Sequence, residues 1–143
     1  MLTSTIKATD ARKEWSSVID GVVREKPKFI TRTRDTLCLS STETMLQLLS
    51  AYQFTAQKFI EDDNSVTLSL NEIDLVENAT TEYDARKKLA DSILEYATDY
   101  YNDFSYWSNA INRKQHIPYV MKALMMNDIK ELGDSIKCQS GEN

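Results

Sequence analysis

The sequence is poor in the residues on which catalytic and metal sites depend. Its 143 residues include one histidine, His116, and two cysteines, Cys38 and Cys138. A multi-histidine metal site and a disulfide framework are therefore excluded. The three glycines are isolated from one another, which excludes a glycine-rich phosphate loop. We predict no catalytic residue, no bound metal and no cofactor, and we expect that the chain is not an enzyme.

Long apolar segments are also missing. No run approaches the roughly 18 consecutive apolar residues of a membrane-spanning helix, and the N-terminus lacks the basic, apolar and small-residue order of a signal peptide. We expect a cytoplasmic protein without a membrane partner, because two distant cysteines fit a reducing compartment. His116 is expected to be solvated or to cap a helix. Cys38 alternates with apolar neighbours and is expected to be buried and inert.

The charges that are present are unevenly distributed. A net charge of −5 at first argues against nucleic acid, but residues 1–34 hold eight Lys or Arg against four Asp or Glu. The remaining residues hold nine basic and eighteen acidic side chains. This asymmetry suits a basic head that meets phosphates and an acidic remainder that meets a basic partner. Chance asymmetry in a small domain is the alternative.

Hydrophobic periodicity predicts a mixed α+β chain that begins with a β-α-β-β-α unit. A short strand ends near Lys7, and an amphipathic helix follows from about Thr9 to Glu25, including Trp15 on its apolar face. Two alternating segments, Lys28–Arg32 and Thr36–Leu39, predict a hairpin. A capping box at Ser40-Ser41-Thr42-Glu43 then opens a helix that runs toward Tyr52.

The rest of the chain predicts a second hairpin and a helical region. Residues 54–70 form the hairpin, which either extends the first sheet or begins another. Thr81 caps a long helix from Glu82 to about Phe104, whose apolar positions step by three or four. Residues 105–137 are predicted to be helical, and residues 139–143 to fray. We therefore expect two domains, residues 1–53 and 54–143.

Three short motifs follow one another in the opening third. They are A-x-x-A-R at Ala8 to Arg12, V-I-D-x-V at Val18 to Val22, and I-T-R at Ile30 to Arg32. With these motifs, residues 2–53 resemble the prevent-host-death (Phd/YefM) antitoxins, which repress transcription of bacterial toxin–antitoxin operons. That family usually has a glycine in the hairpin after the Thr-Arg pair, where φ is positive. Here the link is Thr33-Arg34-Asp35.

The resemblance implies a DNA-binding homodimer, with the helix after Ser40 at the dimer centre. Arginine and lysine gain affinity for DNA by releasing counterions from phosphates, and arginine also reads guanine in the major groove. A twofold dimer presents two such patches to a palindromic operator. The predicted DNA-binding residues are Lys7, Arg12, Lys13, Arg32 and Arg34.

A weaker resemblance covers residues 54–101. A hairpin, a short strand, a T-x-x-D-A sequence and an amphipathic helix are similar to the HicB-type antitoxin unit. The antitoxin resemblance implies a cognate toxin of the basic, RelE-type ribonuclease class. Tyrosine and tryptophan are frequent interface anchors, although a second core would use the same side chains. The predicted toxin-binding residues are Tyr96, Tyr100, Tyr101 and Trp107.

Two functions remain open at this stage. The first is an antitoxin that binds operator DNA as a dimer and neutralises a ribonuclease-type toxin. The alternative is a structural or adaptor protein that uses the antitoxin-like head only to dimerise and does not bind DNA. A neighbouring gene for a small basic protein would favour the first.

Overall fold

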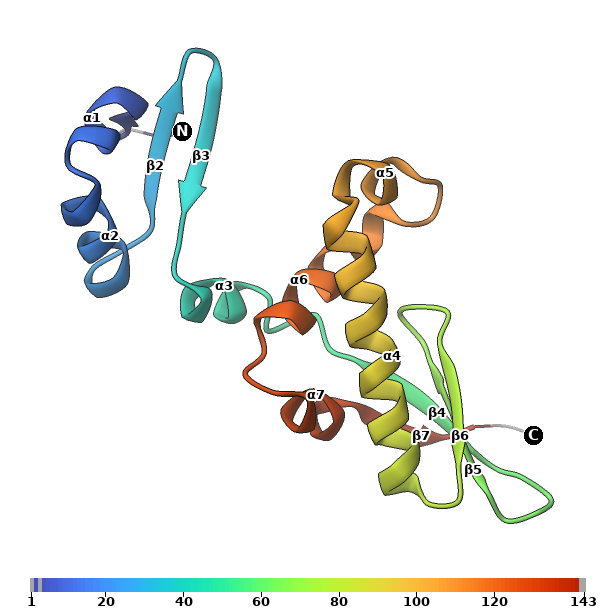
Figure 1. Cartoon of the computed structure of the whole chain (residues 1–143). Coiled ribbons are helices and arrows are strands. Elements are labelled where there is room, and N and C mark those ends of the chain that lie inside the picture. Colours follow the sequence, from blue (N-terminus) through green and yellow to red (C-terminus); the bar gives the residue numbers. More distant parts are fainter. Residues whose placement is uncertain (1, 3, 142–143) are drawn as a thin grey trace. The chain divides into compact units, whose positions relative to one another are not determined.

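The chain folds into two compact units, each containing helices and strands. The computed structural model describes residues 2 and 4–141. The N-terminal unit covers residues 1–48 and the C-terminal unit covers residues 49–143 (Figure 1). The α+β class is confirmed in both units. No helix among the described residues is long and apolar enough to cross a membrane.

A three-stranded sheet with two helices and a following third helix makes up the N-terminal unit. Strand β1 runs parallel to β2, and β2 pairs antiparallel with β3, in the order β1-β2-β3. The single helix predicted from Thr9 to Glu25 is broken at Glu14, whose φ of −117° and ψ of 37° are not helical. The elements are β1 (Ile6–Lys7), α1 (Ala8–Lys13), α2 (Trp15–Arg24), β2 (Lys28–Arg32), β3 (Asp35–Leu39) and α3 (Thr42–Leu48).

The core of the N-terminal unit is small. Its buried hydrophobic side chains are Ala11, Val18 and Val22, all from the two helices. None of the residues of β2, β3 or α3 is fully buried. The predicted burial of Cys38 is wrong, because β3 is an edge strand and this side chain is exposed. Strand alternation assigns side chains to two faces but does not reveal whether either face is covered.

The β2–β3 hairpin has the positive φ for which the resembled family uses glycine. Arg32 pairs with Asp35, so Thr33 and Arg34 form the loop. Thr33 has a φ of 54°, which is unfavourable for a β-branched residue. The sequence therefore places a strained residue at the tip of this hairpin.

Replacing Thr33 by glycine is expected to stabilise the N-terminal unit by about 1 kcal/mol, because glycine adopts positive φ without a steric penalty. Thermal unfolding of the unchanged chain and of the Thr33→Gly variant measures the change in stability. The matched control is Arg34→Gly, since Arg34 has a negative φ. This control is expected to destabilise by about 0.5–1 kcal/mol. Equal effects of the two substitutions would contradict the prediction.

A four-stranded sheet organises the C-terminal unit. Its order is β6-β5-β4-β7, so the hairpin of residues 54–70 belongs to a second sheet. The terminal strand β7 pairs parallel with β4, although the sequence predicted fraying from residue 139 onward. Residues 142 and 143 of that prediction lie outside the described residues. The elements are β4 (Thr55–Ile60), β5 (Val66–Leu70), β6 (Val76–Ala79), α4 (Glu82–Asn102), α5 (Phe104–Asn109), the 3-10 helix η1 (Lys114–His116), α6 (Ile117–Met125), α7 (Ile129–Ser135) and β7 (Lys137–Ser140).

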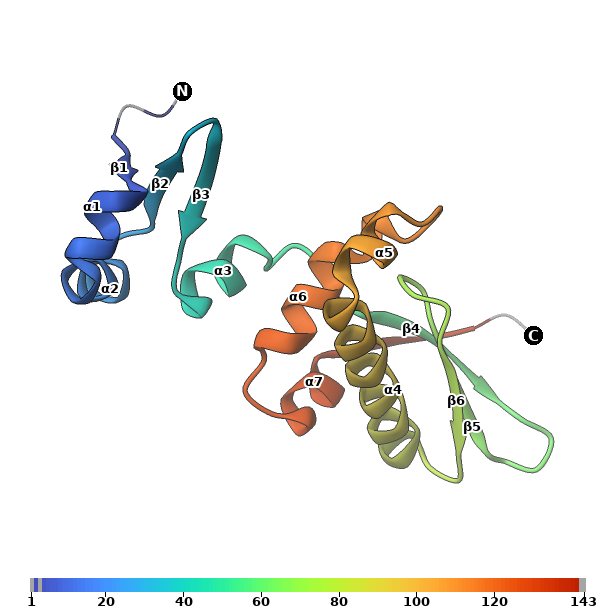
Figure 2. The same cartoon turned by 45° about the horizontal axis from the view of Figure 1, so that its top comes forward.

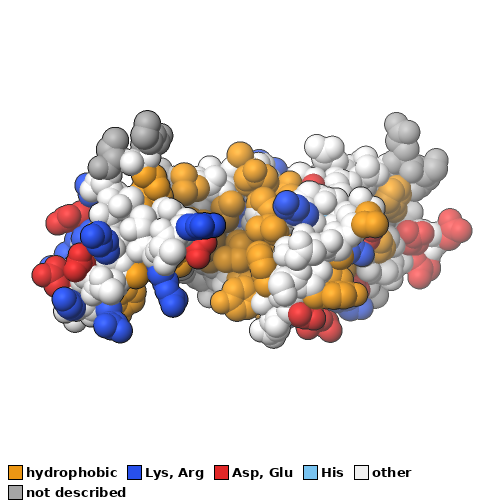
Figure 3. Space-filling view, turned by 90° about the horizontal axis from the view of Figure 1, so that it is seen from above, with side chains coloured by type: hydrophobic (Ala, Val, Ile, Leu, Met, Phe, Trp, Pro, Cys, Tyr) orange, Lys and Arg blue, Asp and Glu red, His pale blue; other side chains and the backbone are white. Residues whose placement is uncertain are grey.

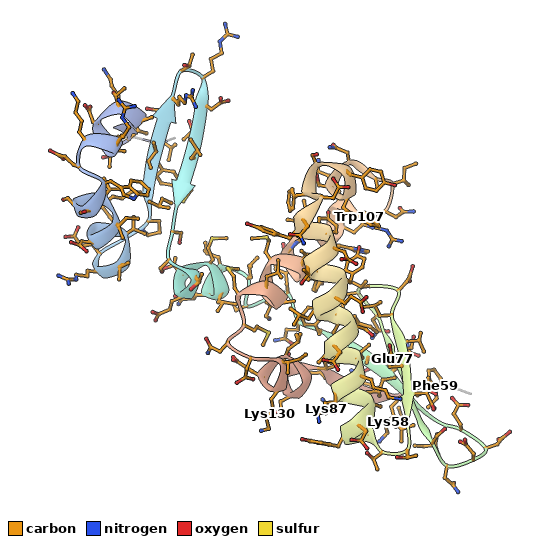
Figure 4. The ribbon with its side chains drawn as sticks, in the orientation of Figure 1. Lys58, Phe59, Glu77, Lys87, Trp107 and Lys130 are labelled. Atoms are coloured by element: carbon orange, nitrogen blue, oxygen red, sulfur yellow. The ribbon has the colours of Figure 1, made fainter. Side chains whose placement is uncertain are left out.

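Helix α4 packs along one face of the second sheet, beside α6 and α7 (Figure 2). Its predicted cap is confirmed, because the Thr81 hydroxyl accepts a hydrogen bond from the Asp84 amide at 3.1 Å. Leu89 and Ile93 of α4 and Leu68 of β5 are fully buried in one core cluster. Glu77 of β6 also points to this helix and accepts a hydrogen bond from the Ser92 hydroxyl (Figure 4). The C-terminal unit therefore has the larger core.

The single histidine belongs to this core. His116 is 6% exposed, and its Nδ1 lies 2.6 Å from the hydroxyl oxygen of Tyr96. Burial lowers the pKa of the imidazole, and the positive charge of Arg113 lowers it further, while Asp74 opposes these effects. The prediction of a solvated or capping histidine is wrong, because a neighbour twenty positions away in sequence determines its surroundings.

Candidate nucleic-acid interface

Basic residues meet at one end of the first sheet. Because β1 and β2 are parallel, their last residues, Lys7 and Arg32, lie at the same end. Arg34 follows in the hairpin loop, and α1 begins directly after Lys7. Several lysine and arginine side chains are visible on the exposed surface of this unit (Figure 3). The fold thus gathers residues that are separated in sequence.

Arg12 and Arg32 line the same shallow groove, which adds Arg12 to the basic residues at this end of the sheet. The groove lies between α1 and the sheet and has a volume of about 590 Å³. Arg12 contributes from the last turn of α1, and Arg32 contributes from the end of β2. The residues that line it are Ala8, Ala11, Arg12, Trp15, Ile30, Arg32 and Leu37. We name this feature the arginine groove.

The predicted cations are available to a ligand. Lys7, Arg12, Lys13, Arg32 and Arg34 are all exposed. None of them forms an ion pair with another residue in the described part of the chain. Arg12 and Arg32 line the arginine groove, whereas Lys7, Lys13 and Arg34 lie outside it. Unpaired cations on a small sheet can contact successive phosphates.

Two apolar residues beside the arginines were not predicted as site residues. Trp15 is 49% exposed and Leu37 is 54% exposed in the arginine groove. Trp15 was assigned to the inward face of a continuous helix, but the break at Glu14 separates it from α1. Leu37 alternates on an edge strand, and this pattern alone does not reveal exposure. The groove therefore combines two cations with an apolar floor.

The predicted toxin-binding residues are divided between core and surface. Tyr100 is fully buried, and its hydroxyl donates a hydrogen bond to the Arg113 carbonyl at 2.8 Å. Burial raises the pKa of both Tyr96 and Tyr100. Trp107 packs against the core with its ring stacked on Tyr100, at a centroid distance of 6.2 Å. Of the four, Tyr101 is the one on the surface, with 57% exposed.

Comparison with known proteins identifies similar chains. A model of the family PHD_like, described as the antitoxin of a RelE/RelB toxin–antitoxin (TA) system, matches residues 1–138. A crystal structure from Syntrophomonas wolfei subsp. wolfei, described as an antitoxin part of a candidate toxin/antitoxin system, is 37% identical with a TM-score of 0.91. The similarity covers 97% of this chain and 100% of that one. No curated protein matches. The family match extends well beyond the predicted residues 2–53 and includes both units.

Proposed function

Because the chain belongs to the PHD-like family of antitoxins from RelE/RelB toxin–antitoxin systems, we propose that it binds operator DNA as a homodimer and neutralises a ribonuclease-type toxin. Membership in this family makes the chain an antitoxin and implies a toxin partner. We also propose that it represses transcription of its operon, that its N-terminal unit has the Phd/YefM arrangement, that it is not an enzyme, and that it acts in the cytoplasm.

One observation carries the DNA-binding part of the proposal. Lys7, Arg12, Arg32 and Arg34 are gathered at one end of the sheet, exposed and without ion pairs among the described residues. The N-terminal unit as a whole holds eight basic and six acidic residues, whereas the C-terminal unit holds nine and sixteen. DNA would therefore favour the N-terminal unit and be repelled by the C-terminal one.

Binding to the DNA upstream of the chain's own gene tests this part. The logarithm of the binding constant should fall linearly with the logarithm of the salt concentration between about 50 and 200 mM, because cations release counterions on contact with phosphates. An unrelated duplex of equal length is the control. Absence of binding to the upstream DNA at low salt would contradict the DNA-binding function and would favour the adaptor alternative.

Dimerisation is supported by the small core of the N-terminal unit. A unit of this size buries a limited share of its surface and often needs a partner for stability. Helix α3, which the family resemblance places at the dimer centre, has no buried residue, and Leu48 at its end is 68% exposed. A second copy that covers α3 would bury this side chain and leave the cations of the arginine groove open to DNA. We propose α3 as the twofold contact.

Replacing Leu48 by glutamate is expected to convert the dimer to a monomer, because a carboxylate buried without a partner is costly. Light scattering measures the molar mass. The matched control is Thr36→Glu, which places the same charge on the exposed strand β3, outside α3, and is expected to leave the dimer intact. A dimeric Leu48→Glu variant would contradict the proposed contact.

The C-terminal unit is proposed to bind the toxin. Its excess of acidic residues complements a basic protein, and RelE-type toxins, which the sequence resemblance implies, are basic. The unit is also well packed, with a core that extends from β4 to α7. It would therefore present a preformed surface instead of a segment that folds only on binding.

A further inference from the structure

Four exposed apolar side chains lie near the carboxyl end of α4. Tyr101 is 57% exposed, Phe104 37%, Tyr106 63% and Ile111 88%. They come from the end of α4, from α5 and from the loop after it. We name them the α5 patch. Isolated apolar side chains are common on surfaces, but several within a short stretch indicate an interaction site.

Aromatic rings that pack in or against the core hold two members of the α5 patch in position. Phe104 packs edge-on against Tyr100, with ring centroids 5.6 Å apart and planes at 73°. Tyr106 packs against Trp107 at 5.3 Å and 82°. Trp107 itself comes from α5 and packs on the core (Figure 4). Aromatic side chains that are already fixed lose little conformational entropy when a partner binds.

Carboxylates lead along α4 to this patch. Asp91, Glu95, Asp99 and Asp103 follow at intervals of four residues, and all are exposed. None of them forms an ion pair with another described residue, and the last turn of α4 has no basic residue. Like charges four residues apart, and negative charges at a helix C-terminus, both destabilise a helix. A cationic surface placed against α4 would remove this repulsion.

We propose that the α5 patch, with the carboxylates of α4 beside it, is the docking surface for a basic protein. This inference depends on the proposed function, and it identifies that protein as the cognate toxin. The aromatic side chains supply the anchors, and the carboxylates supply the attraction for a positive partner. A second copy of the chain does not suit this surface, because a twofold contact would place like charges opposite each other. Nucleic acid is repelled by the same carboxylates.

The test uses the full-length chain and the purified product of the gene adjacent to its own as the toxin probe. The variant Glu95→Gln with Asp99→Asn is expected to weaken binding about tenfold. Its thermal unfolding temperature is expected to stay constant or rise, because like-charge repulsion within α4 is reduced. Tyr106→Ala is expected to weaken binding about tenfold as well.

The matched control removes the same charge elsewhere in the C-terminal unit. Glu61→Gln with Asp62→Asn lies in the exposed turn between β4 and β5 and is expected to bind the probe as the unchanged chain does. Unaltered binding by both α4 and α5 variants would overturn the inference but leave the antitoxin function standing. An equal loss of affinity in the Glu61→Gln, Asp62→Asn control would also overturn the inference. The overall negative charge of the unit would then explain the binding without a specific docking surface.

Failure of the proposed function would give a different result from failure of the docking surface alone. If the unchanged chain does not bind the probe, the toxin-neutralising function fails, and the docking surface fails with it. Binding of the same proteins to the upstream DNA is measured in parallel and is expected to be equal in all of them, because the substitutions leave the N-terminal unit unchanged. Loss of DNA binding in an α4 variant would contradict a local role for these carboxylates.

Discussion

Replacing Arg12 and Arg32 together by alanine is expected to weaken binding to operator DNA about a hundredfold at low salt. A dimer would lose two cations from each protomer, so the loss of binding free energy is twice that of a single protomer. The salt dependence of binding is expected to become less steep, because fewer counterions are released. Gel-shift titration against the upstream DNA at several salt concentrations measures both quantities.

Two controls make this result specific. Lys87→Ala with Lys130→Ala removes two cations from α4 and α7 of the C-terminal unit (Figure 4) and is expected to leave DNA binding unchanged. Arg12→Gln with Arg32→Gln keeps most of the side-chain packing in the arginine groove while removing the charge. Light scattering on each variant shows whether the dimer persists. Full DNA affinity in both arginine variants would contradict the assignment of Arg12 and Arg32 to the DNA contact.

Replacing Leu89 by alanine is expected to destabilise the C-terminal unit by about 3 kcal/mol. Leu89 is fully buried in the core cluster around α4, and truncation of such a leucine removes apolar contacts and leaves a cavity. Denaturant unfolding followed by tryptophan fluorescence measures the change, since Trp107 packs against the same core. Lys87→Ala on the exposed side of α4 is the control and is expected to change stability by less than about 0.5 kcal/mol.

The Leu89→Ala variant also tests whether the units act separately. The N-terminal unit has its own elements and its own proposed function. DNA binding is therefore expected to persist at denaturant concentrations that unfold the C-terminal unit of this variant. Simultaneous loss of DNA binding and of the C-terminal core would show that the two units unfold as one, which contradicts the expectation.

The elements with strong local signals could be predicted from the sequence. Helix α4 has a Thr81 cap and an apolar repeat over many turns, and its predicted range is close to Glu82–Asn102. The two hairpins have alternating segments on either side of turn residues. Local patterns of this kind depend only on neighbouring residues, so they remain valid in the folded chain.

The missed features depend on residues far apart in sequence. Strand β7 has only four residues, Lys137–Ser140, and no clear alternation, and it exists because β4 offers a parallel edge. The buried environment of His116 is formed by Tyr96 from another helix. The arginine groove likewise requires α1 and β2 to pack together. Sequence patterns indicated which residues carry charge, but only the fold shows which of them meet.

The parallel pairing of β4 with β7 has a consequence during synthesis on the ribosome. β4 emerges early, but its second neighbour, Lys137–Ser140, emerges only after all four intervening helices and the 3-10 turn. Until then one edge of β4 stays open, and open strand edges favour aggregation. The N-terminal unit is complete by residue 48. Nascent chains are therefore expected to associate through their N-terminal units before the acidic unit closes its sheet, so assembly would precede capture of the toxin.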